Sequence, residues 1–429
     1  MAGRFTAVTL SLLAASAACA QTTLTLTLNE ALERARRVAG PYQSALIGAQ
    51  LAHEDRVQAR DALLPTLNWF NQYIYTQGNN TPTGTYVAQN GVHVYNNLAE
   101  VHSDVFAPSK RADYQRAIAA EAVARARSEI AARGLTATVV QGYYLLLAAQ
   151  RKYGNAQQSF EEARDFSSIT NKLESGGEAA HSDVVKAEVL LAQRERDTQD
   201  AQLAIERARI GLGVLLFDDY TRDFSVADDL TSPPPLPERA RIDEMAGRNN
   251  PDIGAAQATV RQQEFELKSA KGGYLPVFSL DYFYGIDANQ YAIWNQYGER
   301  NLGSMAQATL MIPVWNWGAT RSRVRQSELR LRQAKLDLTL TQRQLLANLD
   351  AFYLEAQAAA AQLDSLRRSV DLSAESLRLT LLRYEAGEVT VLEVVDAQST
   401  LALARNAYDD GLVRYRLGLA ALETLTGAF

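Results

Sequence analysis

The chain has 429 residues and a formal net charge of −6, with acidic and basic residues interspersed along it. This composition excludes the basic patches through which proteins bind nucleic acid, and no basic stretch is interleaved with aromatic residues. Its single cysteine, Cys19, excludes a disulfide framework.

The first 20 residues have the pattern of a secretory signal peptide. An apolar stretch from Val8 to Ala15 follows a basic residue, and Ala18-Cys19-Ala20 provides a small-residue cleavage site. The stretch is too short to span a bilayer, and no later run of about 20 apolar residues occurs. Cleavage after Ala20 is favoured, because Ser16 stands where a lipoprotein signal has leucine. Acylation of Cys19 is the alternative.

Two similar halves follow the signal segment, at 21–232 and 238–429, joined by the stiff proline-rich linker 233–237. The repetition shows at an offset of 210 residues in the pairs Pro41 and Pro251, Gly177 and Gly387, and Ala187 and Ala397. A constant offset over half of the chain predicts that one structural unit occurs twice. Each unit should contain short helices, a strand pair and a long helical hairpin, and Asn29 is the expected N-cap of the first helix.

Each half contains a predicted pair of β-strands, at 66–106 and 277–312. In the second pair, apolar residues from Phe278 to Ile286 alternate with a mixed set that includes Ser279 and Asp281. Strands of about ten residues suit a membrane-spanning β-barrel. Four strands cannot close a barrel, because known barrels start at about eight. We therefore expect several chains to share one barrel, with three copies supplying twelve strands.

Three tryptophans lie at the predicted junctions between strands and helices. Trp69 follows Leu64-Pro65, and Trp315 and Trp317 follow Pro313. Tryptophan gathers where a membrane protein meets the bilayer interface, so these residues are expected to face outer-membrane lipid. The alternative is that they are core aromatics of a small sheet.

Two long helical hairpins are predicted at 109–217 and 318–426. The tracts lack proline, which would cost about 3 kcal/mol inside a helix, and are rich in strong helix formers. Apolar residues recur every seven positions from Leu331 to Phe352 and again from Leu363 to Tyr384, with an eleven-residue step between the two series. This pattern predicts a coiled coil with a stutter. Residues 318–384 would span about 100 Å, the scale of a periplasm.

Two carboxylates stand about two turns beyond the second hairpin turn. Glu393 and Asp396 are three residues apart, so they share a face of the returning helix. The family resemblance given below implies that three chains would place them in a narrow ring, which would favour cations and bind divalent ions. The alternative is a solvated pair on an outer face.

Together the ordered motifs resemble the TolC family of outer-membrane channel proteins. The resemblance covers about residues 24–427 and is carried by the paired Pro…Leu-Pro elements, the strand pairs, the hairpins, the turn at 384–387 with Val394 to Gln398 after it, and the final Leu422–Gly427. It implies a homotrimer with a twelve-stranded barrel in the outer membrane of a Gram-negative bacterium and an α-helical tunnel through the periplasm. It also implies the exit duct of a tripartite efflux pump or type I secretion system, joined to an inner-membrane pump by a periplasmic adaptor.

The resemblance assigns residues at the periplasmic tip. Glu393 and Asp396 match acidic positions that line the pore constriction, and Asp183 and Tyr384 match positions in contacts that lock the closed state. Val389 departs from the pattern, which has a basic residue there, so we hypothesise that closure rests more on coiled-coil packing. The turns expected to contact the adaptor, where glycine also serves the turn geometry itself, comprise Ser175, Gly176, Gly177, Glu385, Ala386 and Gly387.

The sequence alone leaves two alternative functions. A periplasmic coiled-coil scaffold or adaptor without a pore would not need two strand pairs with lipid-facing alternation. A periplasmic enzyme would need a catalytic constellation, and no nucleophile, phosphate-binding or metal-ligand motif occurs. We therefore expect no catalytic residue, no cofactor and no structural metal. The histidines that lack metal-ligand spacing are His53, His93, His102 and His181.

Overall fold

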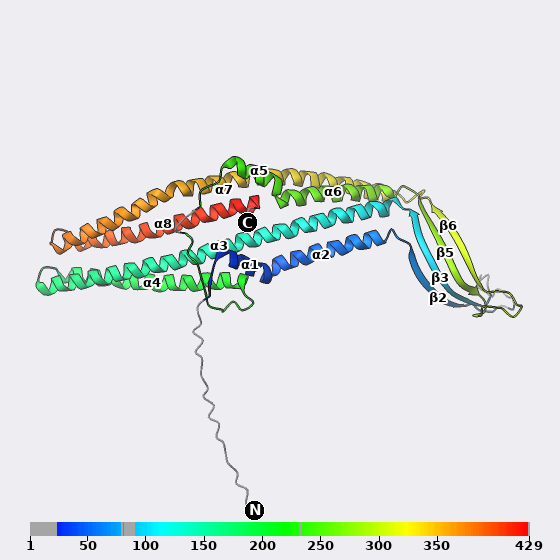
Figure 1. Ribbon diagram of the computed structural model, residues 1–429, viewed down its shortest axis with the longest axis horizontal. Helices are drawn as coiled ribbons and strands as arrows, with labels where there is room; N and C mark the ends of the chain where they lie inside the picture. Colours follow the sequence, from blue (N-terminus) through cyan, green and yellow to red (C-terminus); the bar gives the residue numbers. More distant parts are fainter. Residues whose placement is uncertain (1–23, 79, 81–90, 231–233, 428–429) are drawn as a thin grey trace, which may run out of the picture.

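The computed structural model describes residues 24–78, 80, 91–230 and 234–427 (Figure 1). The expected signal segment with Cys19, most of the loop between the first two long strands and the first linker proline lie outside this part of the chain. No helix among the described residues has the length and apolarity needed to cross a membrane.

Long helices dominate the molecule, and a four-stranded sheet lies at one end of them (Figure 1). This confirms the predicted fold class, which is mainly helical with long hairpins and four longer strands. In chain order the elements are β1 Leu24–Leu26, α1 Leu28–Val38, α2 Gly40–Asp61, β2 Thr66–Tyr75, β3 His93–Phe106, α3 Pro108–Gly176, α4 His181–Leu216, β4 Phe224–Val226, α5 Arg239–Asn249, α6 Pro251–Gly272, β5 Val277–Ala288, β6 Leu302–Met311, α7 Ala319–Glu385 and α8 Val391–Thr426.

The N-cap of α1 is Thr27, so the prediction of Asn29 is wrong. The Thr27 hydroxyl accepts a hydrogen bond from the Glu30 amide at 3.4 Å, and the Glu30 carboxylate accepts one from the Thr27 amide at 2.9 Å. This capping box satisfies two backbone donors at once, whereas Asn29 lies one residue inside the helix. Burial of Ala31, Leu32 and Ala35 then fixes the inner face of α1.

The helices α3 and α7 contain 69 and 67 residues, which makes each about 100 Å long. Pro108 starts α3, where its missing amide would have had no partner within the helix. Helix α4 returns beside α3, and α8 returns beside α7 (Figure 1). The heptad residues Leu345, Leu377 and Tyr384 are buried, so the predicted seam of α7 does face neighbouring helices.

The sheet is antiparallel with strand order β2-β3-β5-β6. Its register aligns Trp69, Ala99, Tyr284 and Ser304 in one row. Because side chains alternate along a strand, every second row of paired residues, counted from this row, lies on the same face of the sheet. The row next to it, which contains Glu100, lies on the opposite face. The first face is mostly apolar and includes Leu67, Trp69, Tyr73, Tyr95, Val101, Leu280, Tyr282 and Tyr284. The second is mostly polar and includes Asn68, Gln72, Asn96, Glu100, His102, Asp104, Asp281, Asp287 and Gln307.

A short parallel pairing of β1 with β4 organises the largest core, midway along the helices. Tyr143 of α3 is 1% exposed, and its hydroxyl donates to the carbonyl oxygens of Ala227 at 2.7 Å and Leu26 at 3.3 Å. The Tyr144 hydroxyl donates to Asp229 at 3.0 Å. Burial raises the pKa of Tyr143 to about 12, so this phenol stays a proton donor throughout the physiological range.

Candidate gate and polar networks of the helical tunnel

The two hairpin turns close the ends of the helices that lie farthest from the sheet (Figure 1). Gly177 and Gly387 adopt φ values of +79° and +74°, in the left-handed region that disfavours side chains. The Ser175 hydroxyl donates to the Asn171 carbonyl at 2.8 Å, which caps the last turn of α3. Gly176, Glu385 and Ala386 are exposed. The backbone conformation of both turns is therefore fixed, and the turns are accessible to solvent in a single chain.

Glu393 and Asp396 line one groove between α7 and α8, as their spacing indicated, and both side chains are exposed. The groove holds about 610 Å³, and its α7 wall is a ladder of hydroxyls that the sequence reasoning missed: Ser365, Ser369, Ser373, Ser376 and Thr380. Steps of three and four residues in small polar side chains were the available signal for this ladder. Thr400 lies one turn beyond Asp396 on the α8 wall. Oxygen atoms therefore lie on both walls of the groove, although Arg368 and Leu372 also line the α7 wall.

Glu393 also has a structural role at the start of α8. Its carboxylate accepts from the Thr390 amide at 3.4 Å, and Thr390 accepts from the amide of Glu393, forming a capping box. Asp396 has no such role in the structure. No group of three or more His, Cys, Asp and Glu side chains in the described ranges could hold a metal ion. A single chain therefore offers two carboxylates and a set of hydroxyls, but no complete metal site.

Tyr384 lies in an apolar cluster at the tip and is 6% exposed. Its ring packs edge-on against Phe166 of α3 at 5.2 Å, and its hydroxyl bonds Thr170 at 3.3 Å. Asp183 instead pairs with Lys186 at 3.1 Å on α4. Within one chain the structure does not bring Tyr384 and Asp183 together. Tyr384 joins the second hairpin to the first, whereas Asp183 stays at the surface of the first.

Replacing Tyr384 with Phe should lower the free energy of unfolding by only about 1 kcal/mol. The change removes the hydrogen bond to Thr170 but keeps the ring packed against Phe166. Urea unfolding followed by circular dichroism measures the difference. Tyr220→Phe, at a side chain that is 53% exposed, is the matched control and should be neutral. A loss above 3 kcal/mol would show that the hydroxyl holds together more than this one contact.

Behind the acidic groove, polar contacts fasten α8 to both helices of the first hairpin. The Gln398 side-chain amide donates to the Glu162 carbonyl at 3.1 Å, and Arg405 pairs with the Glu162 carboxylate at 3.0 Å. Arg194 of α4 donates to the Ser399 hydroxyl at 3.1 Å. The face of α8 opposite to the groove is thus held by the first half of the chain.

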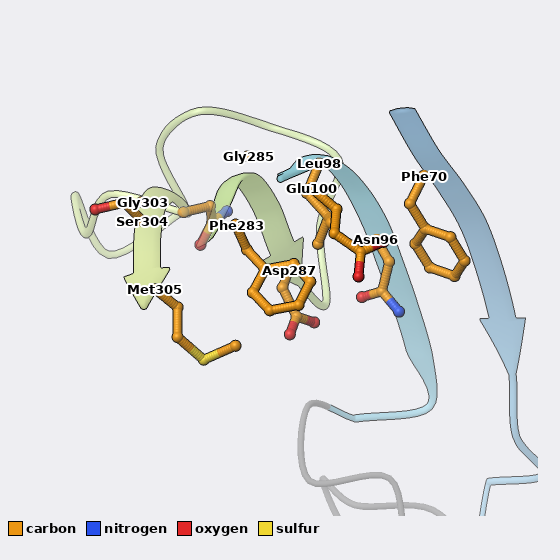
Figure 2. A pocket seen from close by; sticks show the side chains of 11 residues that line it. Phe70, Asn96, Leu98, Glu100, Phe283, Gly285, Asp287, Gly303, Ser304 and Met305 are labelled. Carbon is orange, nitrogen blue, oxygen red and sulfur yellow. The ribbon is translucent and has the colours of Figure 1, made fainter. Parts of the chain in front are cut away.

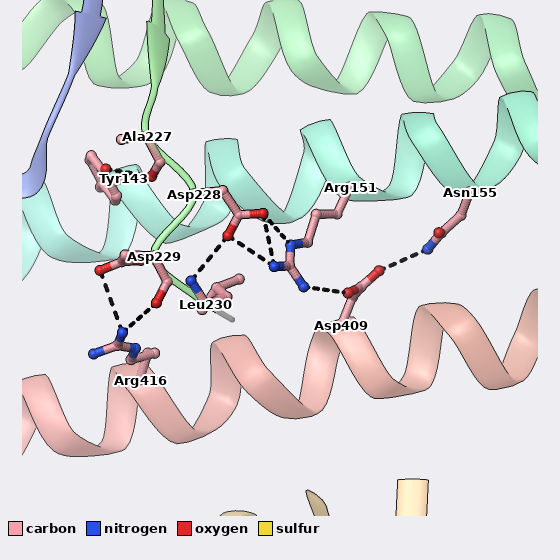
Figure 3. A network of polar contacts seen from close by, with 9 residues as sticks. All are labelled: Tyr143, Arg151, Asn155, Ala227, Asp228, Asp229, Leu230, Asp409 and Arg416. Atoms are coloured by element: carbon pink, nitrogen blue, oxygen red, sulfur yellow. Dashed lines mark hydrogen bonds and ion pairs between the residues drawn. The ribbon is translucent and has the colours of Figure 1, made fainter. Parts of the chain in front are cut away.

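A second network joins the halves midway along the helices (Figure 3). Arg151 of α3 donates to Asp228 at 2.8 and 2.9 Å and to Asp409 of α8 at 3.0 Å. Asn155 also donates to Asp409, at 2.8 Å, and Asp228 accepts from the Leu230 amide at 3.0 Å. Burial opposes the charge of Arg151, but these hydrogen bonds outweigh it and raise the pKa of the guanidinium.

The three tryptophans predicted at the interface are strongly exposed in one chain. Trp69, Trp315 and Trp317 have exposed fractions of 69%, 76% and 89%, which are unusual for core residues. Trp315 and Trp317 pack edge-on at 5.8 Å, and Trp317 has a positive φ of 56°. All three side chains are therefore available for contacts outside the chain.

The sequence matches a family model described as outer membrane efflux protein over residues 244–428. Curated relatives include the alkaline protease secretion protein AprF of Pseudomonas aeruginosa, which is 20% identical over 90% of this chain and 81% of its own length. The outer membrane efflux protein BepC of Brucella suis is 24% identical over 95% of this chain and 87% of its own length.

Solved structures share the fold over nearly the whole chain. The outer-membrane channel OprN superposes with a TM-score of 0.82 at 21% identity, covering 94% of this chain and 90% of that one. The outer membrane protein VceC of Vibrio cholerae superposes with a TM-score of 0.82 at 18% identity, covering 93% and 96% of the two chains. The arrangement of sheet, hairpins and central core is therefore that of known outer-membrane channels.

Proposed function

Because the chain belongs to the TolC family of outer-membrane efflux proteins and resides in the outer membrane, we propose that three copies of it form a gated exit duct. In this duct the sheets close into a twelve-stranded barrel and the helices form a tunnel through the periplasm. The observation that carries the proposal is the sheet with one apolar and one polar face, whose edge strands β2 and β6 each have a single neighbour.

The unpaired edges of the sheet are an argument for a trimer. An unpaired strand edge in lipid costs several kcal/mol per backbone group, so an open four-stranded sheet is not stable there. Pairing β2 of one copy with β6 of the next removes every edge when three sheets form one ring. The apolar face with Trp69 and Tyr284 then meets lipid, and the polar face with Glu100 lines the lumen.

We assign the hairpin turns at 175–177 and 385–387 to contacts with a periplasmic adaptor that links the duct to an inner-membrane pump. The support is their exposure and fixed geometry at the end of the molecule away from the sheet. The relatives named above include a secretion protein and an efflux protein, and both functions need an exit through the outer membrane.

The proposed gate is the ring that Glu393 and Asp396 form when three chains meet. The support is that both carboxylates are exposed in one groove, whereas the opposite face of α8 is fastened to α3 and α4. Closure is proposed to depend on apolar packing at the tip, where Val389 lies beside the cluster of Phe166 and Tyr384.

Replacing Val389 with Arg should therefore change single-channel conductance little. Val389 is half-buried at the edge of the tip cluster, and a long arginine can direct its charge to water. Conductance of the variant in planar bilayers is the measurement, with Val389→Lys as a second cation of different geometry. A large drop in conductance with Arg alone would mean that a specific arginine contact can lock this channel, against the packing hypothesis.

The proposed function is tested by reconstituting the detergent-purified, full-length protein in planar bilayers and measuring its oligomeric state by light scattering. Discrete conductance steps from a trimer are expected. The main alternative, a periplasmic coiled-coil scaffold, predicts a protein that stays folded in buffer without detergent and gives no conductance. Folded protein that neither inserts into the bilayer nor conducts ions would overturn the proposal of an exit duct.

A further inference from the structure

A cavity of about 520 Å³ lies on the polar face of the sheet (Figure 2). All four long strands contribute to it, and its centre is the row Phe70, Leu98, Gly285 and Gly303. This row crosses the last third of β5 and the start of β6, near the strand ends away from the helices. Under the proposed function, on which this inference rests, the cavity opens into the barrel lumen near its outer mouth.

At Gly303 backbone without a side chain forms part of the floor of the cavity, whereas the space above Gly285 is filled by the neighbouring strand at Leu98. A Cβ atom added at Gly303 would meet no atom within 4 Å, so the space above this residue is open. Phe283 and Met305 stand next to the floor in the neighbouring row, and Phe70 stands at its other end (Figure 2). Two aromatic rings and a thioether thus give the cavity an apolar surface inside a lumen that is otherwise polar.

Two polar side chains at the cavity have an acceptor without a partner in the described chain. The side-chain oxygen of Asn96 is buried and has no hydrogen-bond partner in the described chain, while its nitrogen donates to Gln72 at 3.2 Å. The carboxylate of Glu100, which is half-buried, has no ion-pair partner among the described residues. Asp287 also lines the cavity, but it makes an interaction of its own and is therefore not an unpaired acceptor. The Asn96 oxygen is too deeply covered to meet a ligand, so the accessible Glu100 carboxylate is the acceptor at which a donor from outside the chain would be favoured.

The apolar and acidic side chains of the cavity together indicate which class of ligand would bind. Two carboxylates repel anions, and the described residues hold no group of three ligands for a metal ion. An organic cation can donate N–H groups to the Glu100 carboxylate and place its charge near the face of an aromatic ring. Its apolar portion can lie against Phe283 and Met305, and a cavity of this size accommodates a small molecule.

We propose that this cavity is a binding site for small amphiphilic organic cations with N–H donors, separate from the acidic gate at the far end of the tunnel. Cations leaving the duct bind on the lumen face of the barrel, with the ammonium at Glu100 and the apolar group on Phe283. The site gives the outer mouth a preference for one class of passing molecule.

The test uses the full-length protein in detergent and a 19F NMR titration with 4-fluorophenethylammonium. The neutral probe is 2-(4-fluorophenyl)ethanol, which has the same ring without the charge. The cation should bind about tenfold more tightly than the alcohol, because only the cation forms charge-assisted hydrogen bonds. Glu100→Gln should weaken binding of the cation about tenfold and leave binding of the alcohol unchanged.

Two further variants separate the cavity from other sites. Gly303→Val fills the open floor and should weaken binding of both probes, whereas Glu264→Gln, at an exposed carboxylate of α6, should affect neither. The double variant Glu393→Gln and Asp396→Asn removes any binding of the cation at the gate and should still bind the cation about tenfold more tightly than the alcohol. Equal affinities for the two probes, or a loss of binding only in the gate variant, would overturn the site. Conductance measured on the same preparations reports separately on the duct, so a non-conducting protein with selective binding contradicts only the proposed function.

Discussion

Replacing Arg151 with Met is expected to lower the free energy of unfolding by about 3 kcal/mol, because it leaves the buried carboxylate of Asp409 without a cation. The Arg151 side chain is 19% exposed, and that of Asp409 is 10% exposed. Methionine fills most of the space of the arginine stem but donates no hydrogen bond. Asp409 then keeps only the neutral donor Asn155. Urea unfolding followed by circular dichroism gives the difference.

The neighbouring Lys152 provides the matched control. It pairs with Asp410 at 2.7 Å, but the two side chains are 42% and 56% exposed. An exposed pair of this kind contributes between 0 and about 1 kcal/mol, so Lys152→Met should have little effect. Equal losses in the two variants would mean that the central network contributes no more than an ordinary surface ion pair. Adding Asp409→Asn to Arg151→Met should recover part of the loss, since it removes the unpaired charge.

The same network predicts a dependence of stability on pH. Burial alone would raise the pKa of Asp228, but the hydrogen bonds from Arg151 and the Leu230 amide outweigh it, and the pKa is lowered. A carboxylate with a lowered pKa contributes its full stabilisation above the ordinary carboxyl pKa of about 4. This stabilisation is lost as the pH falls below that value. The stability difference between the unchanged protein and Arg151→Met should therefore shrink between about pH 4 and pH 3. A constant difference across this range would exclude Asp228 as the titrating group.

Periodic patterns are what made the fold predictable from the sequence. The heptads that end at Tyr384 and the alternation from Phe278 to Ile286 arise because a helix or strand repeats its buried face at a fixed spacing. The mainly helical fold with four longer strands can therefore be predicted from the sequence alone. Repetition of one unit helps further, because the clearer second copy supports the assignment of the first.

Contacts between distant parts of the chain leave no such pattern. Arg151 and Asp409 lie 258 positions apart, and β1 and β4 are three-residue strands separated by nearly half the chain. Neither has a periodicity, so the central core and its ionic network became visible only in the structure. The tip is an intermediate case. Glu393 and Asp396 were placed on one face from their spacing, but the hydroxyl ladder opposite them requires the pairing of α7 with α8.

Neutralising the acidic pair is expected to abolish most of the cation preference of the channel. In the proposed trimer, Glu393→Gln with Asp396→Asn removes six carboxylates from the proposed constriction. We expect the ratio of cation to anion permeability to fall on the order of tenfold, and block by divalent cations to disappear. Reversal potentials in a KCl gradient across a planar bilayer measure the ratio, and added Mg²⁺ measures the block.

The choice of amides isolates the charge from the fold. Glu393 completes the capping box with Thr390, and glutamine at this position can accept the same backbone hydrogen bond, so α8 should start where it does now. Glu375→Gln is the matched control, because Glu375 lies on α7 in a pair with Arg378 at 2.7 Å and does not line the groove. An unchanged permeability ratio in the double variant would place the two carboxylates on the outer surface of the trimer. A similar fall in both variants would instead indicate a diffuse effect of net charge. Only a fall confined to the double variant makes the groove between α7 and α8 the selective part of the tunnel.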